Sequence, residues 1–382
     1  TGTGVGINAL VSRSLGEKKQ EYANSAANNG IYLAIFSFIG FAIVCGFFAP
    51  AFFRVQTTDP QIMEYGVDYV RVIGIMSFGL FIQLTCEKLL QSTGKTVYSM
   101  ATQLLGAIIN IILDPIMIFG LFGFPRLGIL GAGIGTALSR LIGVGLLFHK
   151  LQQTSHRLQG PIFSRDQHIF KTEIVKRALP IMGERLMMRL GDIVIFVIII
   201  AYGSKVFAGN AIGETITAYN YLPAFGFATG ASILIARAYG AKDHLEIRKL
   251  TKTSFVMTTI ISTLVGGIIF AFSTFILNFF TFDAVAVSAA QVVILISFVS
   301  EPIVAGVIIY TAALQAMGDA KTPFYATMFG MWVIRIGIAW LLGTAFGWGI
   351  WGVWIATVLD NIFRLIVLKL VYECRIKNQN IN

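Results

Sequence analysis

Residues 289–316 have the sequence AAQVVILISFVSEPIVAGVIIYTAALQA, in which Glu301 is the one charged side chain. A helix needs about 20 apolar residues to cross the hydrocarbon core of a bilayer, and this stretch exceeds that length. The rest of the chain is similar, because 56% of the 382 residues are apolar and 13% are charged, with a mean hydropathy of +0.76. In soluble domains about 25% of the residues are charged. The sequence therefore excludes a soluble fold and predicts a helical membrane protein.

Nine further stretches have the length and composition of a membrane span, and each is bounded by charged residues or by Gly and Pro. None of the ten has the strict alternation of apolar and polar residues that a transmembrane barrel strand requires, so we expect helices. Residues 1–12 are expected to be the tail of another span. The expected spans are 28–50, 65–90, 98–119, 127–147, 178–202, 209–236, 255–280, 289–316, 324–346 and 350–372.

The basic residues of the loops alternate along the chain. One set of loops contains 20 Lys and Arg, and the other set contains three. Under the positive-inside rule the basic set is cytoplasmic, which places the C-terminus in the cytoplasm. This distribution accounts for the net charge of +10, since a nucleic-acid-binding protein would gather its basic residues on one face. We therefore expect a multi-pass protein of the cell inner (plasma) membrane that contacts lipids and binds no nucleic acid.

The two halves of the chain resemble each other at a constant offset of 224 residues. Both copies run in the same direction and have the same loop charges, as in transporters built from two parallel repeats of six spans. We expect an N-terminal lobe at 1–150, a cytoplasmic linker at 151–177 and a C-terminal lobe at 178–382. The matched positions are Gly6, Arg13, Gly16, Leu90 and Gly94 in the first copy, and Gly230, Arg237, Gly240, Leu314 and Gly318 in the second.

The second copy opens with the span at 178–202, and the counterpart of this span would precede residue 1. We expect about 12 spans in the full protein and about 10.5 in this sequence. The first helix and part of the second are then expected to lie outside it. The predicted fold is an all-α polytopic membrane protein of two six-helix bundles.

Asp114 is the acid that the sequence singles out most clearly. A charged group at mid-membrane is costly, and no basic residue of the same helix is within reach of Asp114. Asn110 lies one turn earlier on the same face, and Thr136 reaches a similar depth from the next span. Carboxylate, amide and hydroxyl oxygens suit a sodium ion, and an isolated carboxylate can instead take a proton. The second copy has no acid at this position, and a structural role for Asp114 before Pro115 is the alternative.

Four residues of the C-terminal lobe are secondary candidates for a substrate cavity or for ion coupling. Glu184 lies inside the first span of this lobe, near several methionines that suit an adaptable apolar cavity. Glu301 has no basic residue in its own span, so it can either form a buried ion pair with Arg335, the third candidate, or take part in transport. The fourth candidate is Asp192.

Two acid–base pairs are spaced for contact within one helix, and we interpret them as structural before functional. Glu87, next to Lys88, is interpreted as an ordinary charge at the end of a span. The two pairs are Arg189 with Asp192 and Asp360 with Arg364.

No enzyme motif stands out in the sequence. Residues 94–96, Gly-Lys-Thr, resemble the end of a phosphate-binding loop, but the glycine required five positions earlier is Leu89. The four His have no metal-ligand spacing, and the three Cys are widely separated. We therefore expect no enzymatic activity, no cofactor and no metal other than a coupling sodium ion at Asp114, Asn110 and Thr136.

The sequence resembles the multidrug and toxic compound extrusion (MATE) transporters of bacteria and archaea along essentially its whole length. The resemblance implies a V-shaped pair of six-helix lobes that alternates between inward and outward openings. It also implies a monomer that uses a sodium or proton gradient to export mostly cationic amphipathic compounds. The motifs that carry it are SRSLG (12–16), LLQSTG (89–94), NIILDP (110–115), GILGAGIGT (128–136) and LQAMGD (314–319).

One branch of this family has a cation site with Asn and Asp four residues apart on the fifth span and Thr on the sixth. Asn110, Asp114 and Thr136 match this pattern. The partner acid of the family lies on the first span, outside this sequence. Another branch uses acids of the seventh and tenth spans, where Glu184 and Glu301 lie without a position-by-position match.

The sequence thus predicts a secondary active multidrug exporter that works by antiport and alternating access. The first alternative is a lipid-linked oligosaccharide flippase of the same superfamily, which would need a basic cavity for pyrophosphate. A membrane prenyl transferase would need Asp-rich loops, which are not found, and a passive channel fits a two-lobe repeat less well. The basic residues that support the flippase alternative are Arg140, Arg185, Arg189, Arg335 and Arg364.

Overall fold

The computed structural model describes residues 2–56, 60–152 and 168–379, and these residues are almost entirely helical. No strand occurs in the described ranges, so the all-α prediction is confirmed. The chain divides into two compact units, Thr1–Lys176 and Arg177–Asn382. Of the expected linker at 151–177, residues 153–167 lie outside the described ranges, and the helix α7 begins at His168.

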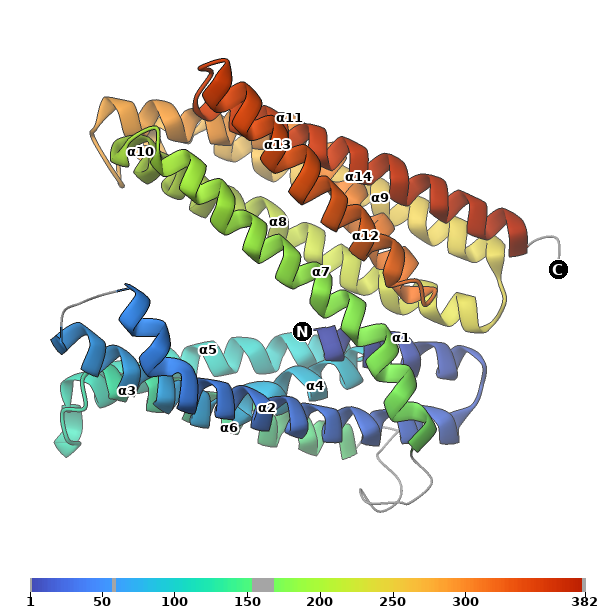
Figure 1. Ribbon diagram of the computed structural model, residues 1–382. Helices are drawn as coiled ribbons and strands as arrows, with labels where there is room; N and C mark the ends of the chain where they lie inside the picture. Colours follow the sequence, from blue (N-terminus) through green and yellow to red (C-terminus); the bar gives the residue numbers. More distant parts are fainter. Residues whose placement is uncertain (1, 57–59, 153–167, 380–382) are drawn as a thin grey trace. The chain divides into compact units, whose positions relative to one another are not determined.

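The first unit consists of helices that lie side by side (Figure 1). Helix α4 is central, because it contacts α1, α2, α5 and α6, while α3 contacts α2 and α6. The α5–α6 connection contains a short 3₁₀ turn, η1 (Leu121–Gly123). The helices are α1 (Gly2–Gly16), α2 (Gln20–Gln56), α3 (Pro60–Met76), α4 (Phe78–Ser92), α5 (Thr96–Phe119) and α6 (Ile129–Gln152).

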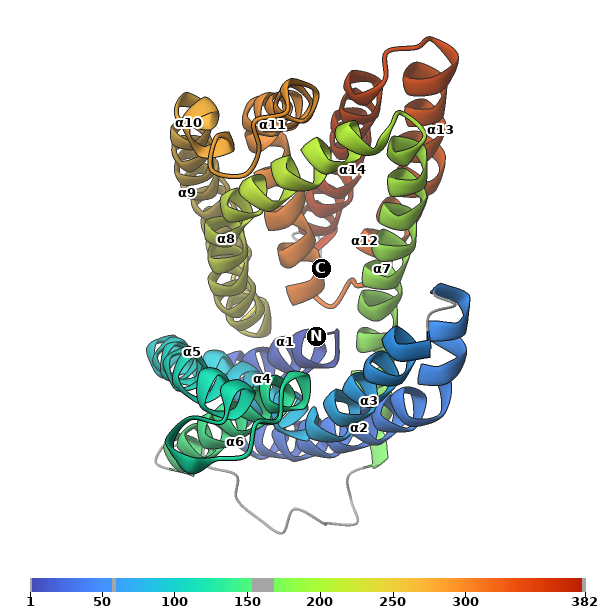
Figure 2. The ribbon, with the colours of Figure 1, turned by 90° about the vertical axis from the view of Figure 1, so that its left-hand side faces the viewer.

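In the second unit, α11 packs against α8, α9 and α14 (Figure 2). The expected span at 324–346 is an irregular helix, in which two π-helical segments follow an α-helical start. The helices are α7 (His168–Ile200), α8 (Ser204–Gly240), α9 (His244–Ala271), α10 (Ser273–Leu277), α11 (Ala284–Ala316), α12 (Lys321–Phe329), η2 (Gly330–Arg335), α13 (Ile336–Ile338), η3 (Ala339–Ala345) and α14 (Ile350–Gln379).

Each of the ten expected spans coincides with a helix or with consecutive helical segments. Within the described part of the chain, six helices are long and apolar enough to cross a membrane by length and composition. The number is seven if Met63–Met76 and Phe78–Ser92, which are bent by 42° at Ser77, form one span. Many large apolar side chains point outward, including Phe47 at 79% and Ile111 at 71% exposure. Exposed apolar surface of this extent is typical of helices that face lipid.

The internal repeat is visible in the turns that join corresponding helices. Lys18, between α1 and α2, has φ 58°, and Lys242, at the equivalent place between α8 and α9, has φ 60°. Gly94 and Gly318 form a second such pair, with φ 87° and 88°. The backbone hydrogen bonds match as well. The Glu17 amide donates to the Arg13 carbonyl, and the Ala241 amide donates to the Arg237 carbonyl, both at 2.9 Å. Left-handed lysines are uncommon, so the coincidence supports a true repeat.

A buried apolar cluster lies near these turns in each unit. In the first unit, Leu89, Leu90 and Leu147 pack with Ile7. In the second unit, the corresponding cluster includes Leu314. Burial at equivalent positions explains why both copies keep the same sequence there, since the closely packed interior tolerates little change in volume.

Two aspartates in loops of the second unit cap the N-termini of the helices that follow them. Asp243 accepts a hydrogen bond from the Glu246 amide (2.9 Å) at the start of α9. Asp283 accepts from two amides at the start of α11, and Lys205 Nζ lies 2.6 Å from its carboxylate. Lys205, and then the backbone amides, hold the pKa of Asp283 below its usual value.

Candidate functional site

Asn110, Asp114 and Thr136 come together where α5 packs against α6. The Asn110 side-chain amide donates to Asp114 Oδ1 at 2.8 Å and to Thr136 Oγ1 at 3.3 Å. The contact between Asn110 and Asp114 follows from their i, i+4 spacing on one helix. Thr136 also donates to the Ala132 carbonyl (2.9 Å), which fixes its hydroxyl on α6. The three side chains singled out by the sequence are therefore neighbours in space.

Small residues of α6 make this approach possible. A Cβ atom at Gly135 would lie 2.5 Å from Asp114 Oδ1. One turn earlier, a Cβ atom at Gly131 would collide with the Met117 backbone of α5. Because α6 meets α5 at Gly131 and Gly135, the Asp114 carboxylate lies directly against the α6 backbone.

Gly135→Ala is expected to lower stability by about 1–3 kcal/mol, since the new methyl group must displace the Asp114 carboxylate from Asn110. Thermal unfolding of the purified full-length protein measures the effect. Gly145→Ala is the matched control, because Gly145 lies on the same helix with no atom within 4 Å of an added Cβ. Equal melting temperatures for the two variants would contradict the close contact at Gly135.

The cluster around Asp114 can bind a proton or a small cation. No ion pair joins Asp114 to a basic residue within the ranges that the structure describes. The carboxylate and the Thr136 hydroxyl offer oxygen atoms, and rotation of the Asn110 amide by 180° would present its carbonyl oxygen as well. Hard cations such as sodium prefer ligands of this kind.

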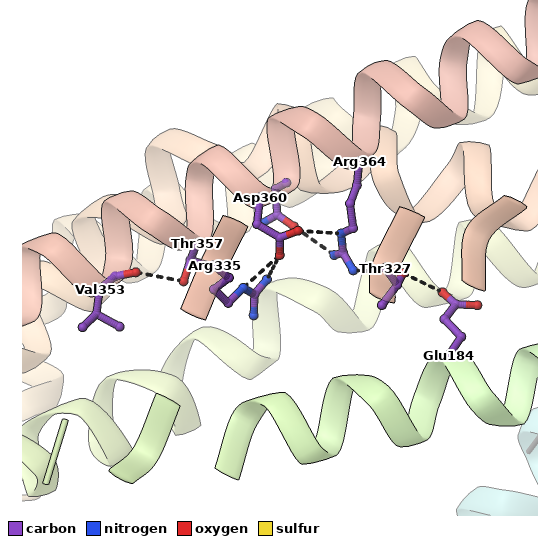
Figure 3. A network of polar contacts seen from close by, with 8 residues as sticks. Glu184, Thr327, Arg335, Val353, Thr357, Asp360 and Arg364 are labelled. Carbon is purple, nitrogen blue, oxygen red and sulfur yellow. Dashed lines mark hydrogen bonds and ion pairs between the residues drawn. The ribbon is translucent and has the colours of Figure 1, made fainter. Parts of the chain in front are cut away.

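The equivalent place in the second unit has the opposite charge. Arg335 stands near the position of Asn110 in the repeat and, from η2, contacts Asp360 of α14, with Nη2 2.7 Å from Oδ2 (Figure 3). Arg364, one turn after Asp360, lies with Nε 3.5 Å from Oδ1. Asp360 is completely buried between the two guanidinium groups. The predicted local pair of Asp360 and Arg364 is thus part of a larger cluster.

Glu184 of α7 belongs to the same polar network (Figure 3). Its carboxylate accepts from Gln315 Nε2 at 3.0 Å and from Thr327 Oγ1 at 3.5 Å. Thr327 in turn accepts from Arg364 Nη1 at 3.3 Å. Glu184 is buried, so the network links α7 to α11, α12 and α14 inside the second unit.

The interpretation that Glu301 pairs with Arg335 is wrong. Glu301 of α11 is buried and accepts from Asn220 Nδ2 of α8 at 3.0 Å. Its side chain faces α9, where a Cβ atom at Gly266 would lie 3.4 Å from Glu301 Cγ. Arg335 instead pairs with Asp360.

Asp192 is held by its own helix. Its Oδ2 lies 3.5 Å from Arg189 Nη1, and the Arg189 side chain is 85% exposed. This is the predicted i, i+3 pair, and an exposed pair of this kind contributes little stability.

Two acids, the buried Glu87 and the half-buried Glu214, were missed or misjudged from the sequence. Glu87 was interpreted as an ordinary charge at a span end, yet it is 3% exposed and accepts hydrogen bonds from two glutamines, Gln83 and Gln103. Glu214 of α8 accepts from Asn210 Nδ2 at 3.0 Å. In both cases an amide precedes the acid by four residues, as Asn110 precedes Asp114, and this pattern was the available signal.

Comparison with known proteins identifies relatives over nearly the whole chain. The family model MatE matches residues 1–116 and 180–341. A probable multidrug resistance protein NorM from Thermotoga maritima is 26% identical over 373 residues, which cover 96% of this chain and 79% of the relative. The multidrug export protein MepA from Staphylococcus haemolyticus is 23% identical over 378 residues, covering 97% of this chain and 81% of the relative.

Solved structures share the fold. One is described as an outward-facing conformation of a multidrug resistance MATE family transporter of the MOP superfamily. It superposes with a TM-score of 0.91 and 22% identity, covering 100% of this chain and 85% of that chain. The similarity extends over both helical units.

Proposed function

Because the chain belongs to the MatE family, the multidrug and toxic compound extrusion transporters, we propose that it exports cationic amphipathic compounds in exchange for sodium ions or protons. Export proceeds by alternating access of the two lobes, and the full protein works as a monomer in the cell inner (plasma) membrane with its C-terminus in the cytoplasm. Relatives named for multidrug resistance and multidrug export support this choice of substrate.

The observation that carries the proposal is the cluster of Asp114, Asn110 and Thr136. Asp114 has a hydrogen-bond donor at 2.8 Å and no basic partner among the ion pairs of the described residues. A carboxylate held in this way can bind and release a coupling ion, whereas an acid in a tight ion pair cannot do so without breaking the pair.

Two arginines of the second unit, Arg335 and Arg364, favour a cationic rather than a pyrophosphate-bearing substrate. Arg335 and Arg364 both face Asp360, and Arg364 is also bonded to Asn361 Oδ1 (3.0 Å) and Thr327. Their guanidinium groups are therefore occupied. A lipid-linked oligosaccharide flippase would need such groups free to hold phosphate oxygens.

Uptake of a cationic dye into proteoliposomes of the full-length protein tests the proposal. A sodium gradient and a proton gradient are applied separately, and we expect at least one of them to drive uphill dye movement. An ionophore that collapses the driving gradient serves as the control and should stop the movement. Failure of both gradients would exclude ion-coupled export of this substrate class.

A further inference from the structure

A line of polar side chains runs along the first unit from Asp114 to the turn between α4 and α5. On α5, Gln103, Asn110 and Asp114 are separated by seven and four residues, so they share one helix face. At the α4 end, Gln91 Nε2 donates to Ser99 Oγ (3.1 Å). A polar stripe inside a predicted membrane span is costly and points to a function.

Glu87 is the second acid on this line. Gln83 Nε2 donates to its Oε1 at 2.9 Å, and Gln103 Nε2 donates to its Oε2 at 2.8 Å. Glu87 is buried, whereas Gln103 is exposed at the surface of the unit. The carboxyl group thus lies one side chain away from the outside of the helix bundle.

The two basic residues near Glu87, Lys88 and Arg140, form hydrogen bonds with glutamines and not with Glu87. Lys88, the next residue of α4, donates from Nζ to Gln91 Oε1 at 2.9 Å. Arg140, from α6, donates from Nη1 to Gln83 Oε1 at 3.5 Å. No ion pair of Glu87 occurs among the residues that the structure describes. Glu87 is therefore held by amides alone and remains free to take up a proton.

These contacts suit a proton better than a sodium ion. Both carboxylate oxygens of Glu87 face N–H donors, and the Gln83 carbonyl oxygen is turned to Arg140. A sodium ion would need several oxygen atoms aimed at one point. A proton needs one oxygen atom, and its arrival removes a buried charge.

The two acids are separate from each other. Gln103 and Asn110 are about 10.5 Å apart along the helix axis, at 1.5 Å per residue. Gly106 lies between them, and a Cβ atom there would lie 3.9 Å from the Ser139 carbonyl oxygen, which is an ordinary contact between α5 and α6. The two carboxyl groups are therefore not in contact.

The second copy of the repeat lacks this line. At the offset of 224, Glu87 corresponds to Thr311 and Gln83 to Val307. In the next helix, where Lys95-Thr96 matches Lys321-Thr322 at an offset of 226, Gln103 corresponds to Phe329. The same offset pairs Asp114 with Trp340. The two acids are thus present together in one copy and absent together from the other.

We propose that Glu87 is a second proton-binding residue of the transport cycle, near the α4–α5 turn of the first unit. When a proton binds, the Glu87 carboxylate becomes a carboxyl group, and when the proton is released to water the carboxylate forms again. The inference rests on the proposed antiport and extends it with a second residue that binds the coupling proton.

Glu87→Gln tests this role in proteoliposomes of the full-length protein. The amide keeps the size of the side chain but cannot carry the proton. We expect proton-driven uptake of the cationic dye to fall about tenfold or more, as for loss of a proton-transfer group. Dye binding and dye-for-dye exchange should stay within about twofold of the wild type, because neither requires proton movement.

Chemical rescue separates a proton carrier from a structural residue. Glu87→Ala should lose proton-driven uptake as well, and formate, which fits the vacated space, should restore part of it. Glu21→Gln is the matched control, because Glu21 is an exposed acid of the same unit, and it should behave as the wild type.

The outcomes also separate this inference from the proposed antiport. Proton-driven uptake by Glu87→Gln at the wild-type rate would overturn the inference while leaving the antiport intact. An equal loss of dye exchange, or no rescue of Glu87→Ala by formate, would assign Glu87 a structural role. Transport driven by sodium alone would exclude a proton-binding role for Glu87, and a wild type that responds to neither gradient would overturn the antiport and the inference together.

Discussion

Asp114→Asn is expected to abolish ion-driven export while leaving the fold intact. The amide is nearly the same size as the carboxylate and can still bond to Asn110, which now donates to Asp114 Oδ1 at 2.8 Å. It cannot bind a proton at neutral pH, and it lacks the charge that a sodium ion requires. Uphill uptake of the cationic dye should therefore fall to the background of empty liposomes under either gradient.

The control for this substitution is Asp68→Asn, because Asp68 is an exposed acid of the same unit. Elution volume and melting temperature should match the wild type for both variants. Unchanged transport by Asp114→Asn would contradict its role in coupling. Thr136→Val should weaken transport less, because it removes one neutral oxygen and leaves the charge in place.

Asp360→Asn should give the largest loss of stability. The Asp360 carboxylate is completely buried, with Arg335 at 2.7 Å and Arg364 at 3.5 Å. Neutralising the acid leaves two buried guanidinium groups without a counter-charge, and removal of one partner from a buried ion pair costs about 3–5 kcal/mol. Thermal unfolding of the purified protein should show a drop in melting temperature of several degrees.

Asp192→Asn provides the comparison in the same unit. Asp192 pairs with Arg189, whose side chain is 85% exposed, and exposed pairs contribute at most about 1 kcal/mol. A melting temperature of Asp360→Asn as high as that of Asp192→Asn would mean that Arg335 and Arg364 find other partners when the acid is lost.

The spans could be predicted because a membrane leaves the chain few choices. A long apolar stretch must satisfy its backbone groups internally, so it becomes a helix. The bend at Ser77 was not predicted, since the expected span at 65–90 contains no proline at that point. Pro115 and Pro302, by contrast, lie inside continuous helices. Neighbouring helices compensate for a proline. The bend instead lies where Ser77 Oγ donates to the Gly74 carbonyl at 2.8 Å, as at other kinks that contain Gly and Ser.

The site around Asp114 could be predicted because two of its three members lie on one helix. A spacing of four residues fixes the mutual orientation of Asn110 and Asp114. The partner of Glu301 could not be found in the same way, since Asn220 is 81 residues away and belongs to another helix. The position of a residue along its span gives its depth in the membrane, but it does not show which neighbouring helix the side chain faces.

Glu87 was misjudged for a related reason. Its neighbour in sequence, Lys88, points elsewhere, because adjacent residues of a helix lie about 100° apart. An amide four residues before an acid in an apolar helix is the better guide. That rule finds Glu87 after Gln83, Asp114 after Asn110 and Glu214 after Asn210.

The left-handed turns at Lys18 and Lys242 bear on the origin of the chain. After a gene duplicates, mutations accumulate wherever selection tolerates them, and the two copies have kept the same corner with the same unusual backbone. A corner shared at the same offset is what two copies of one bundle retain, because each copy must reverse its chain direction at the same place. Asp114, which has no acid at its counterpart, marks a place where the two halves differ in chemistry.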